Sequence, residues 1–350
     1  METPGKTFWM SPTRALRGAN GIVAGARQTG NISWTATRSF VDDFFAPRTD
    51  TEQVMATHAR TFRFATRFLP TDYRDPTLRL YAFFRTLDDL VDDSPSDPDS
   101  RLKVTAEVDA WAEWFHSGRQ SPAPRPLMGR DISLICSTYD IPSRTFLDFL
   151  DGMRADLHSE TPATRADVEH YSYQVASTVG ITMAHVFRAT GSSAISAATR
   201  LGIAMQLTNI LRDVGGDLAR ERVYLPLSLL EKHNLSVEDV RTNWIDGVGP
   251  DERLRGAIQE MICWADEHYA AGISGIRLLP EDVRMPILIS ARLYQRILRQ
   301  LERNDCDSLR KRAATTGWQK LSETMRAAID VERPDSGIHS EVKETRVDAR

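Results

Sequence analysis

Two pairs of aspartates carry the first chemical signal in this sequence. Asp88 and Asp92 are four residues apart, and so are Asp213 and Asp217. In a helix such residues share one face, and two like charges at that spacing destabilise the helix by roughly 0.2–0.5 kcal/mol. A bound divalent cation would reverse the sign of this effect. Magnesium commonly takes one or two carboxylates together with phosphate oxygens, so the pairs indicate metal–phosphate chemistry.

Polar residues that suit phosphate share the helix face of the first pair. Tyr81 and Arg85 point within about 60° of Asp88 and Asp92 in a helix. An apolar stripe that should pack into the core runs beside them: Leu80, Phe84, Leu87 and Val91. Taken alone, this string is more typical of a solvated acidic helix end.

The second pair repeats this geometry on another amphipathic segment. Gln206 and Asn209 share its face, and amides in an apolar setting need partners, which a metal–phosphate cluster supplies. Guanidinium donors that suit phosphate come from Arg212, Arg220 and Arg222. A polar helix face explains the charges of one pair but not the repeat. Facing each other across a bundle, the pairs could hold magnesium and a diphosphate.

The elements that must position these residues are helices almost throughout. Periodic segments are long and alternating patterns are scarce. Helices are expected near 51–68, 76–93, 99–117, 129–138, 144–157, 165–190, 192–218, 226–231, 250–272, 281–303 and 308–329. No linker interrupts them, so we expect one all-α domain at 51–330, a single bundle of long helices around one core.

The ends of the chain differ from this domain. Residues 1–50 are rich in Gly, Ser, Thr and Arg, and we expect a disordered extension, with a transit peptide as the alternative. Residues 331–350 are expected to form a polar tail. The net charge of −4 does not favour nucleic acid, and three scattered cysteines exclude a disulfide framework. No uncharged apolar run reaches the ~18 residues of a spanning helix.

Over about 55–330 the sequence resembles the squalene/phytoene synthase family. Beyond the two aspartate motifs, the matching stretches are 58–62, 81–85, 151–156, 171–180 and 206–226, with Tyr294 and 302–307. Three residues depart from the family pattern: Ala59 for a serine, Ser177 for a glycine and Gly216 for an acid. None of these changes removes an expected metal ligand.

The resemblance implies a role for each matching residue. It implies an isoprenoid synthase fold with a central apolar cavity, and magnesium ligands at Asp88, Asp92, Asn209, Asp213 and Asp217. Diphosphate contacts are implied for His58, Arg60, Thr61, Tyr81, Arg85, Arg212, Arg222 and Tyr294. Gln206 is implied beside the metal cluster, and Tyr171 near the reacting carbons.

The implied activity is head-to-head condensation of two prenyl diphosphates. Small Thr66, one turn beyond Phe62, favours the twenty-carbon geranylgeranyl substrate and phytoene as product. The alternatives are squalene or dehydrosqualene synthesis from farnesyl diphosphate, a class I terpene cyclase, and a non-catalytic family member. Magnesium is expected as cofactor, with manganese as an alternative and no NADPH. We expect a cytoplasmic enzyme with peripheral membrane contact, or a plastid one if 1–50 is a transit peptide; the oligomeric state stays open.

Overall fold

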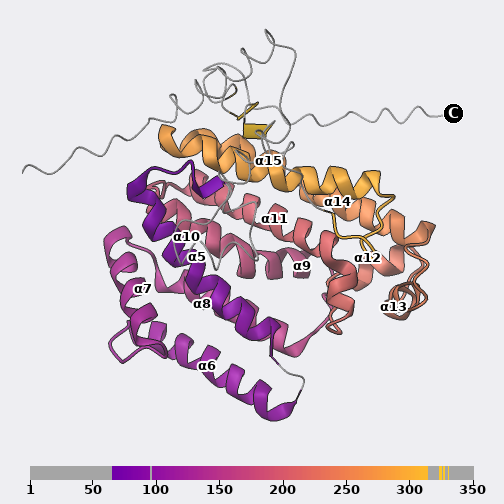
Figure 1. Ribbon diagram of the computed structural model, residues 1–350, viewed down its shortest axis with the longest axis horizontal. Coiled ribbons are helices and arrows are strands. Elements are labelled where there is room, and N and C mark those ends of the chain that lie inside the picture. The colour runs from indigo at the N-terminus through magenta and orange to yellow at the C-terminus, as the bar shows by residue number, and fades with distance from the viewer. Residues whose placement is uncertain (1–64, 95–96, 314–322, 325, 328–329, 331–350) are drawn as a thin grey trace, which may run out of the picture. The chain divides into compact units, whose positions relative to one another are not determined.

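The computed structural model describes residues 65–94, 97–313, 323–324, 326–327 and 330. All regular structure within them is helical (Figure 1). The elements are α5 (Thr71–Asp92), α6 (Pro98–His116), α7 (Pro126–Tyr139), α8 (Ser143–His158), α9 (Arg165–Ser172), η1 (Tyr173–Ser177), α10 (Thr178–Val186), α11 (Ser192–Leu218), α12 (Leu227–Lys232), α13 (Val237–Ile245), α14 (Glu252–Ser274), η2 (Gly275–Leu278) and α15 (Glu281–Arg303). The expected all-α fold class is therefore confirmed.

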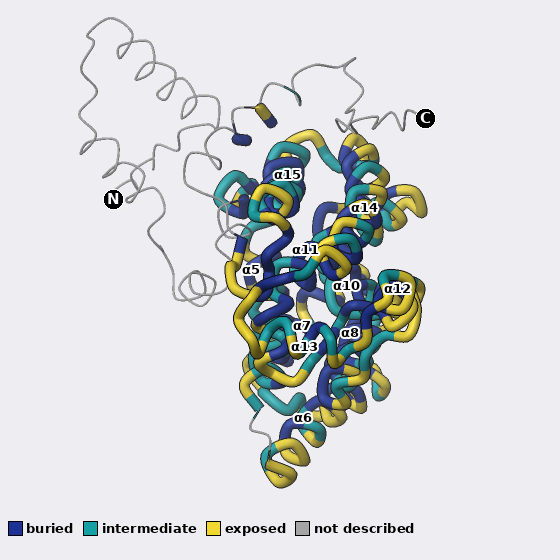
Figure 2. The backbone as a smooth tube through the Cα atoms, turned by 90° about the vertical axis from the view of Figure 1, so that its right-hand side faces the viewer, coloured by how far each residue is buried: buried dark blue, intermediate teal, exposed yellow. Residues whose placement is uncertain are grey.

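Helix α11 occupies the centre of the described bundle. It packs against α14, η1, α10 and α15. Figure 2 shows buried stretches of α11 and α10 on the inside, whereas α6 and α12 carry exposed residues. At Gly202 of α11, any side chain would collide with the backbone of Ser177 in η1, so glycine permits this close packing. The motif residues 206–217 are thus placed on the most enclosed helix.

A cluster of aromatic side chains joins α5 to α6 and α8. Phe83 meets Trp111 edge-on at 5.1 Å between centroids, and Phe115 stacks on Phe146 at 4.6 Å. Such pairs add about 0.5–1.5 kcal/mol each beyond area burial. This core fixes α5, and with it the first aspartate pair.

Helices α9 and α10 are one continuous helical run with a π-helical turn, η1, between them. A single helix was expected at 165–190, so the run itself was anticipated and the π turn was not. Such turns contain one residue more than an α-helical turn and occur frequently at functional sites.

Three helix predictions differ from the structure. The helix expected from 76 begins earlier, at Thr71, and contains Pro76. Helix α13 was missed because it is short and mostly polar, although Ser236 and Asp239 form a capping box at its start. The helix expected at 308–329 is wrong over 308–313, where the chain forms turns and irregular structure, whereas residues 323–324 and 326–327 are helical as expected. Asp305 and Cys306 adopt left-handed backbone conformations (φ 55° and 56°) that end α15 and redirect the chain.

None of the described helices combines the length and low charge needed to cross a membrane.

Candidate functional site

Both aspartate pairs line one cavity with a volume of about 520 Å³. Its walls come from α5, α8, α9, η1, α10, α11, α14, η2 and α15. The predicted site residues that line it are Tyr81, Arg85, Asp88, Asp92, Tyr171, Gln206, Asn209, Arg212, Asp213, Asp217, Arg222 and Tyr294. Another three, His58, Arg60 and Thr61, lie outside the described residues. Every predicted site residue that the structure describes thus faces the same space.

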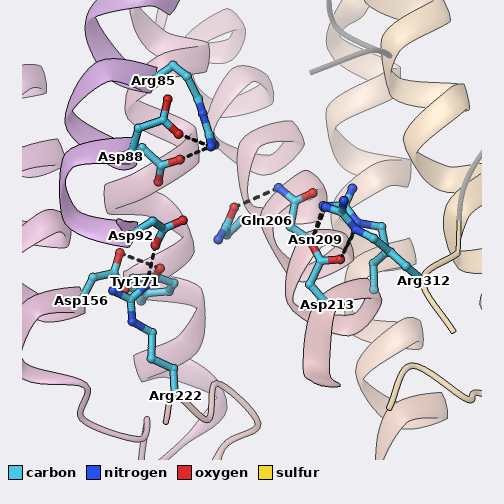
Figure 3. A network of polar contacts seen from close by, with 12 residues as sticks. Arg85, Asp88, Asp92, Asp156, Tyr171, Gln206, Asn209, Asp213, Arg222 and Arg312 are labelled. Carbon is cyan, nitrogen blue, oxygen red and sulfur yellow. Dashed lines mark hydrogen bonds and ion pairs between the residues drawn. The ribbon is translucent and has the colours of Figure 1, made fainter. Parts of the chain in front are cut away.

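The first pair lies on the last turns of α5. Arg85 donates to Asp88 at 2.5 Å, and Arg222, from the segment after α11, donates to Asp92 at 2.5 Å (Figure 3). Burial and the neighbouring charge of Asp92 raise the pKa of Asp88 to about 7, against the opposing effect of Arg85. The two arginines therefore do not fully balance the negative charge of the carboxylates clustered around Asp88 and Asp92.

The second pair is held differently. Asp213 accepts hydrogen bonds from Arg212 and from Arg312, whose Nε and Nη2 atoms lie 2.7 and 3.1 Å from the carboxylate oxygens. Burial opposes ionisation, but these two guanidinium groups outweigh it and lower the pKa of Asp213. Burial and the charge of Asp213 raise the pKa of Asp217 to about 8. The charge of Asp213 is thus balanced by arginines, whereas Asp217 lacks such partners among the described residues and tends to hold a proton.

The space between the pairs contains the two amides of α11 (Figure 3). Asn209 Nδ2 donates to Gln206 Oε1 at 3.2 Å. The Asn209 Oδ1 atom is buried and has no hydrogen-bond partner among the described residues. A buried oxygen without a partner is costly, and a cation would satisfy it.

Within the described part of the chain, no group of three or more His, Cys, Asp or Glu side chains is arranged to hold a metal ion. Magnesium needs one or two carboxylates and takes its other ligands from water and phosphate. Two separated pairs and one unpartnered amide oxygen fit that donor set, with diphosphate oxygens completing it.

Comparison with known proteins agrees with this geometry. The family model described as squalene/phytoene synthase matches residues 55–319. This chain belongs to that family. It is 34% identical over 283 residues to 15-cis-phytoene synthase of Synechococcus elongatus, covering 77% of this chain and 88% of that one. It is 33% identical to phytoene synthase of Thermus thermophilus, covering 81% and 94%.

Solved structures show the same fold. A dehydrosqualene synthase in complex with ligand matches with a TM-score of 0.70 and 23% identity, covering 84% of this chain and 98% of that one. The squalene synthase HpnC from Alicyclobacillus acidocaldarius matches with a TM-score of 0.63 and 21% identity, covering 73% and 92%. The expected isoprenoid synthase fold is confirmed.

The family resemblance gave Asp156 no role, yet it lies at the centre of the site. Asp156 is 6% exposed, and its carboxylate accepts hydrogen bonds from Tyr171 at 3.1 Å and Tyr224 at 2.6 Å. The two phenol rings stack at 4.9 Å. Burial raises the pKa of Asp156 to about 6, although both phenols and Arg222 act against this shift. Its sequence signal was an acid three residues after Met153 on the core face of α8.

Arg312 was also missed, because only the fold brings it to Asp213. A close approach at Gly215 explains how. The Gly215 amide donates to the Ser308 carbonyl at 3.1 Å, and a Cβ at Gly215 would overlap the carbonyl of Leu309. Glycine here lets the chain after α15 lie against α11 and deliver Arg312. Gly216 has open space around it.

Two further residues from the sequence comparison have clear positions. Ser177 is buried and donates to the Thr199 carbonyl at 2.7 Å, so the serine is accommodated between η1 and α11. Thr66 is buried and is not among the described residues that line the cavity.

Proposed function

We propose that this protein is a phytoene synthase, which joins two geranylgeranyl diphosphates head to head through prephytoene diphosphate and releases diphosphate. One observation carries the proposal. A single cavity combines two aspartate pairs and five arginines with a long apolar wall of small residues. Such a space suits two substrates that each have an anionic head and a hydrocarbon tail. The phytoene synthases among the relatives support the same activity.

The chain's own residues would bind and orient the diphosphates. Arg85, Arg212 and Arg222 line the polar end, where guanidinium groups suit phosphate oxygens. Asp88, Asp92, Asn209, Asp213 and Asp217 would hold magnesium, which supplies Lewis acidity and neutralises the leaving diphosphate. Manganese is the alternative cation, and we propose no role for NADPH.

The rest of the cavity would protect the allylic carbocation that forms when the substrate loses its diphosphate. Its apolar walls exclude water, which would otherwise quench the cation. Burial and the adjacent Asp156 carboxylate hold the pKa of Tyr171 well above its usual value, so its phenol stays neutral and donates to Asp156. Tyr171 would thus be a fixed, neutral group beside the reacting carbons.

The decisive experiment supplies the purified protein with magnesium and either geranylgeranyl or farnesyl diphosphate, with and without NADPH. We expect a forty-carbon hydrocarbon from geranylgeranyl diphosphate, indifferent to NADPH and abolished by a chelator. A thirty-carbon hydrocarbon from farnesyl diphosphate alone would instead establish dehydrosqualene or squalene synthesis, as in the structural relatives. Diphosphate release without a condensed product would indicate a terpene cyclase, and no reaction a non-catalytic member.

A matched pair of variants tests the metal-ligand assignment. Asp88→Ala should reduce turnover by orders of magnitude and keep the helical fold. Asp75→Ala on the same helix removes an exposed carboxylate that pairs with Arg79 outside the cavity, and should leave turnover unchanged. Near-normal activity of Asp88→Ala would refute the assignment.

We also propose peripheral contact with a membrane, because phytoene is insoluble in water, and a cytoplasmic location unless 1–50 is a transit peptide. Flotation of the protein with lipid vesicles tests the contact. A protein that stays at the bottom of the gradient would argue against it.

A further inference from the structure

The cavity extends far beyond its polar end along α11. Residues of α11 that line it recur from Asp217 and Asp213 through Gln206 and Ala198 to Ala194. At about 1.5 Å per residue, the distance from Asp213 to Ala194 is about 28 Å. The far end of the cavity is therefore several helical turns away from the carboxylates.

Helix α10 runs antiparallel to α11 along this wall. Gly202 meets the backbone of Ser177, and a Cβ at Gly180 would lie 3.1 Å from the carbonyl oxygen of Ala198. Moving three residues forward from Ser177 to Gly180 thus corresponds to moving four residues back on α11, from Gly202 to Ala198. One further turn in the same direction pairs Ala184 with Ala194.

The segment from α14 into η2 follows α11 in the same antiparallel sense. A Cβ at Gly272 would lie 2.9 Å from the Leu201 amide nitrogen, and Gly275 meets the side chain of Ala197. One further turn brings Leu279 to the level of Ala194.

These three elements line the far end of the cavity. Ala184, Ala194 and Phe187 are 2%, 8% and 2% exposed, and Leu279 packs against the hydrophobic core cluster that contains Phe187. All four line the cavity. Two of them carry only a methyl group, so they leave room that larger side chains would fill. We call Ala184, Ala194, Phe187 and Leu279 the floor.

We propose that the two alanines of the floor set the length of the prenyl chain that the cavity accepts. This inference rests on the proposed function and adds a residue-level basis for its twenty-carbon substrate. The diphosphate is held at the polar end, so the opposite end of the chain must stop at the floor. A side chain that projects from Ala194 would occupy the place of the last isoprene unit and would not touch the head.

The test compares Ala194→Leu with the wild-type protein on geranylgeranyl and farnesyl diphosphates in competition. We expect the variant to lose roughly tenfold or more in its preference for geranylgeranyl diphosphate, because a hydrophobic pocket discriminates by about 10–200-fold per methylene. Ser196→Leu is the control, because Ser196 is exposed on the same helix and does not line the cavity. It should keep the wild-type preference.

A second variant covers the case in which Ala194→Leu fails to fold. Ala198→Leu projects into the cavity one turn nearer the polar end and should exclude geranylgeranyl diphosphate more strongly than farnesyl diphosphate. Thermal shift with magnesium and inorganic diphosphate shows that the polar end is intact, and this shift should match wild type in both variants.

The outcomes separate the two proposals. Folded wild-type protein that makes no hydrocarbon from geranylgeranyl diphosphate refutes the proposed function. If the wild-type protein makes the forty-carbon product and the folded variants keep its substrate preference, the proposal about the floor is refuted and the proposed function stands.

Discussion

At the residue scale, the four motif aspartates differ in their charge balance. Asp213 has two guanidinium partners, whereas burial and neighbouring carboxylates raise the pKa of Asp88 to about 7 and that of Asp217 to about 8. A metal ligand must be deprotonated, so metal binding at these groups releases protons. The metal-free site should therefore take up protons as the pH falls below about 8, in competition with the cation.

This predicts a pH-dependent stability of the metal-free protein. The pKa of Asp217 is raised from 3.8 to about 8 on folding, so its contribution to stability is fully present below pH 3.8 and is lost as the pH rises through about 8. Asp217→Asn removes that loss. In chelator, its melting temperature should exceed that of wild type by a few degrees at pH 8.5, and by less at pH 5. A difference independent of pH would contradict this assignment.

A second residue-scale prediction concerns Asp156. Asp156→Asn keeps the volume but replaces a charged acceptor of two phenol hydrogen bonds, which are worth about 1.5–3 kcal/mol each. Turnover should fall roughly 10–100-fold, because Tyr171 loses its fixed orientation.

Asp148→Asn is the matched control. Asp148 is also buried on α8 and accepts from a tyrosine, Tyr173 at 2.8 Å, but it does not line the cavity. Both variants should lose some thermal stability, and only Asp156→Asn should lose turnover. Equal kinetic losses would mean that Asp156 acts through stability alone.

At the element scale, the sequence predicted the long helices well and the chain after them poorly. The expected spans 192–218 and 281–303 match α11 and α15, because Gly191 and Pro280 mark their starts and an apolar period fills them. After α15 an amphipathic pattern continues, yet Asp305 and Cys306 turn the chain back onto α11. The partners of that turn lie about 90 residues earlier in the sequence, so no local pattern could reveal it.

This packing predicts opposite effects for two adjacent glycines of α11. Gly215→Ala should destabilise the protein by about 1–3 kcal/mol, since its Cβ would overlap the Leu309 carbonyl. Gly216→Ala should stabilise it by up to about 1 kcal/mol, because the site is open and alanine favours a helix. Denaturant unfolding of both variants measures the difference. A Gly215→Ala variant as stable as the wild-type protein would show that the chain after α15 does not pack closely against α11.

At the scale of the whole molecule, the site joins residues from across the chain. Tyr81 and Arg312 line the same cavity. The motif aspartates, the two amides, Arg85 and Arg212 were predictable because they lie on two regular helices, α5 and α11. Asp156 and Arg312 were missed because their roles arise from spatial neighbours. The division into 1–50, 51–330 and 331–350 stays a prediction.

That division can be tested directly. A chain that begins at residue 51 retains the whole stretch matched by the family model, 55–319. We expect it to keep the melting temperature of the full chain. Its turnover should stay within about twofold of that of the full chain. Loss of turnover with an unchanged helical circular dichroism spectrum would assign residues 1–50 a part in the reaction.

The π-helical turn at Tyr173–Ser177 has a consequence for how this sequence can vary. Tyr171 precedes the turn and Ala184 follows it, and both line the cavity. Deleting one residue within the turn would rotate everything before it by about 100° relative to everything after it. Tyr171 would then face away from Asp156, although no residue of the site had been replaced. The number of residues in this turn therefore matters as much as their identity. A one-residue deletion there should abolish activity, as the loss of a motif aspartate would.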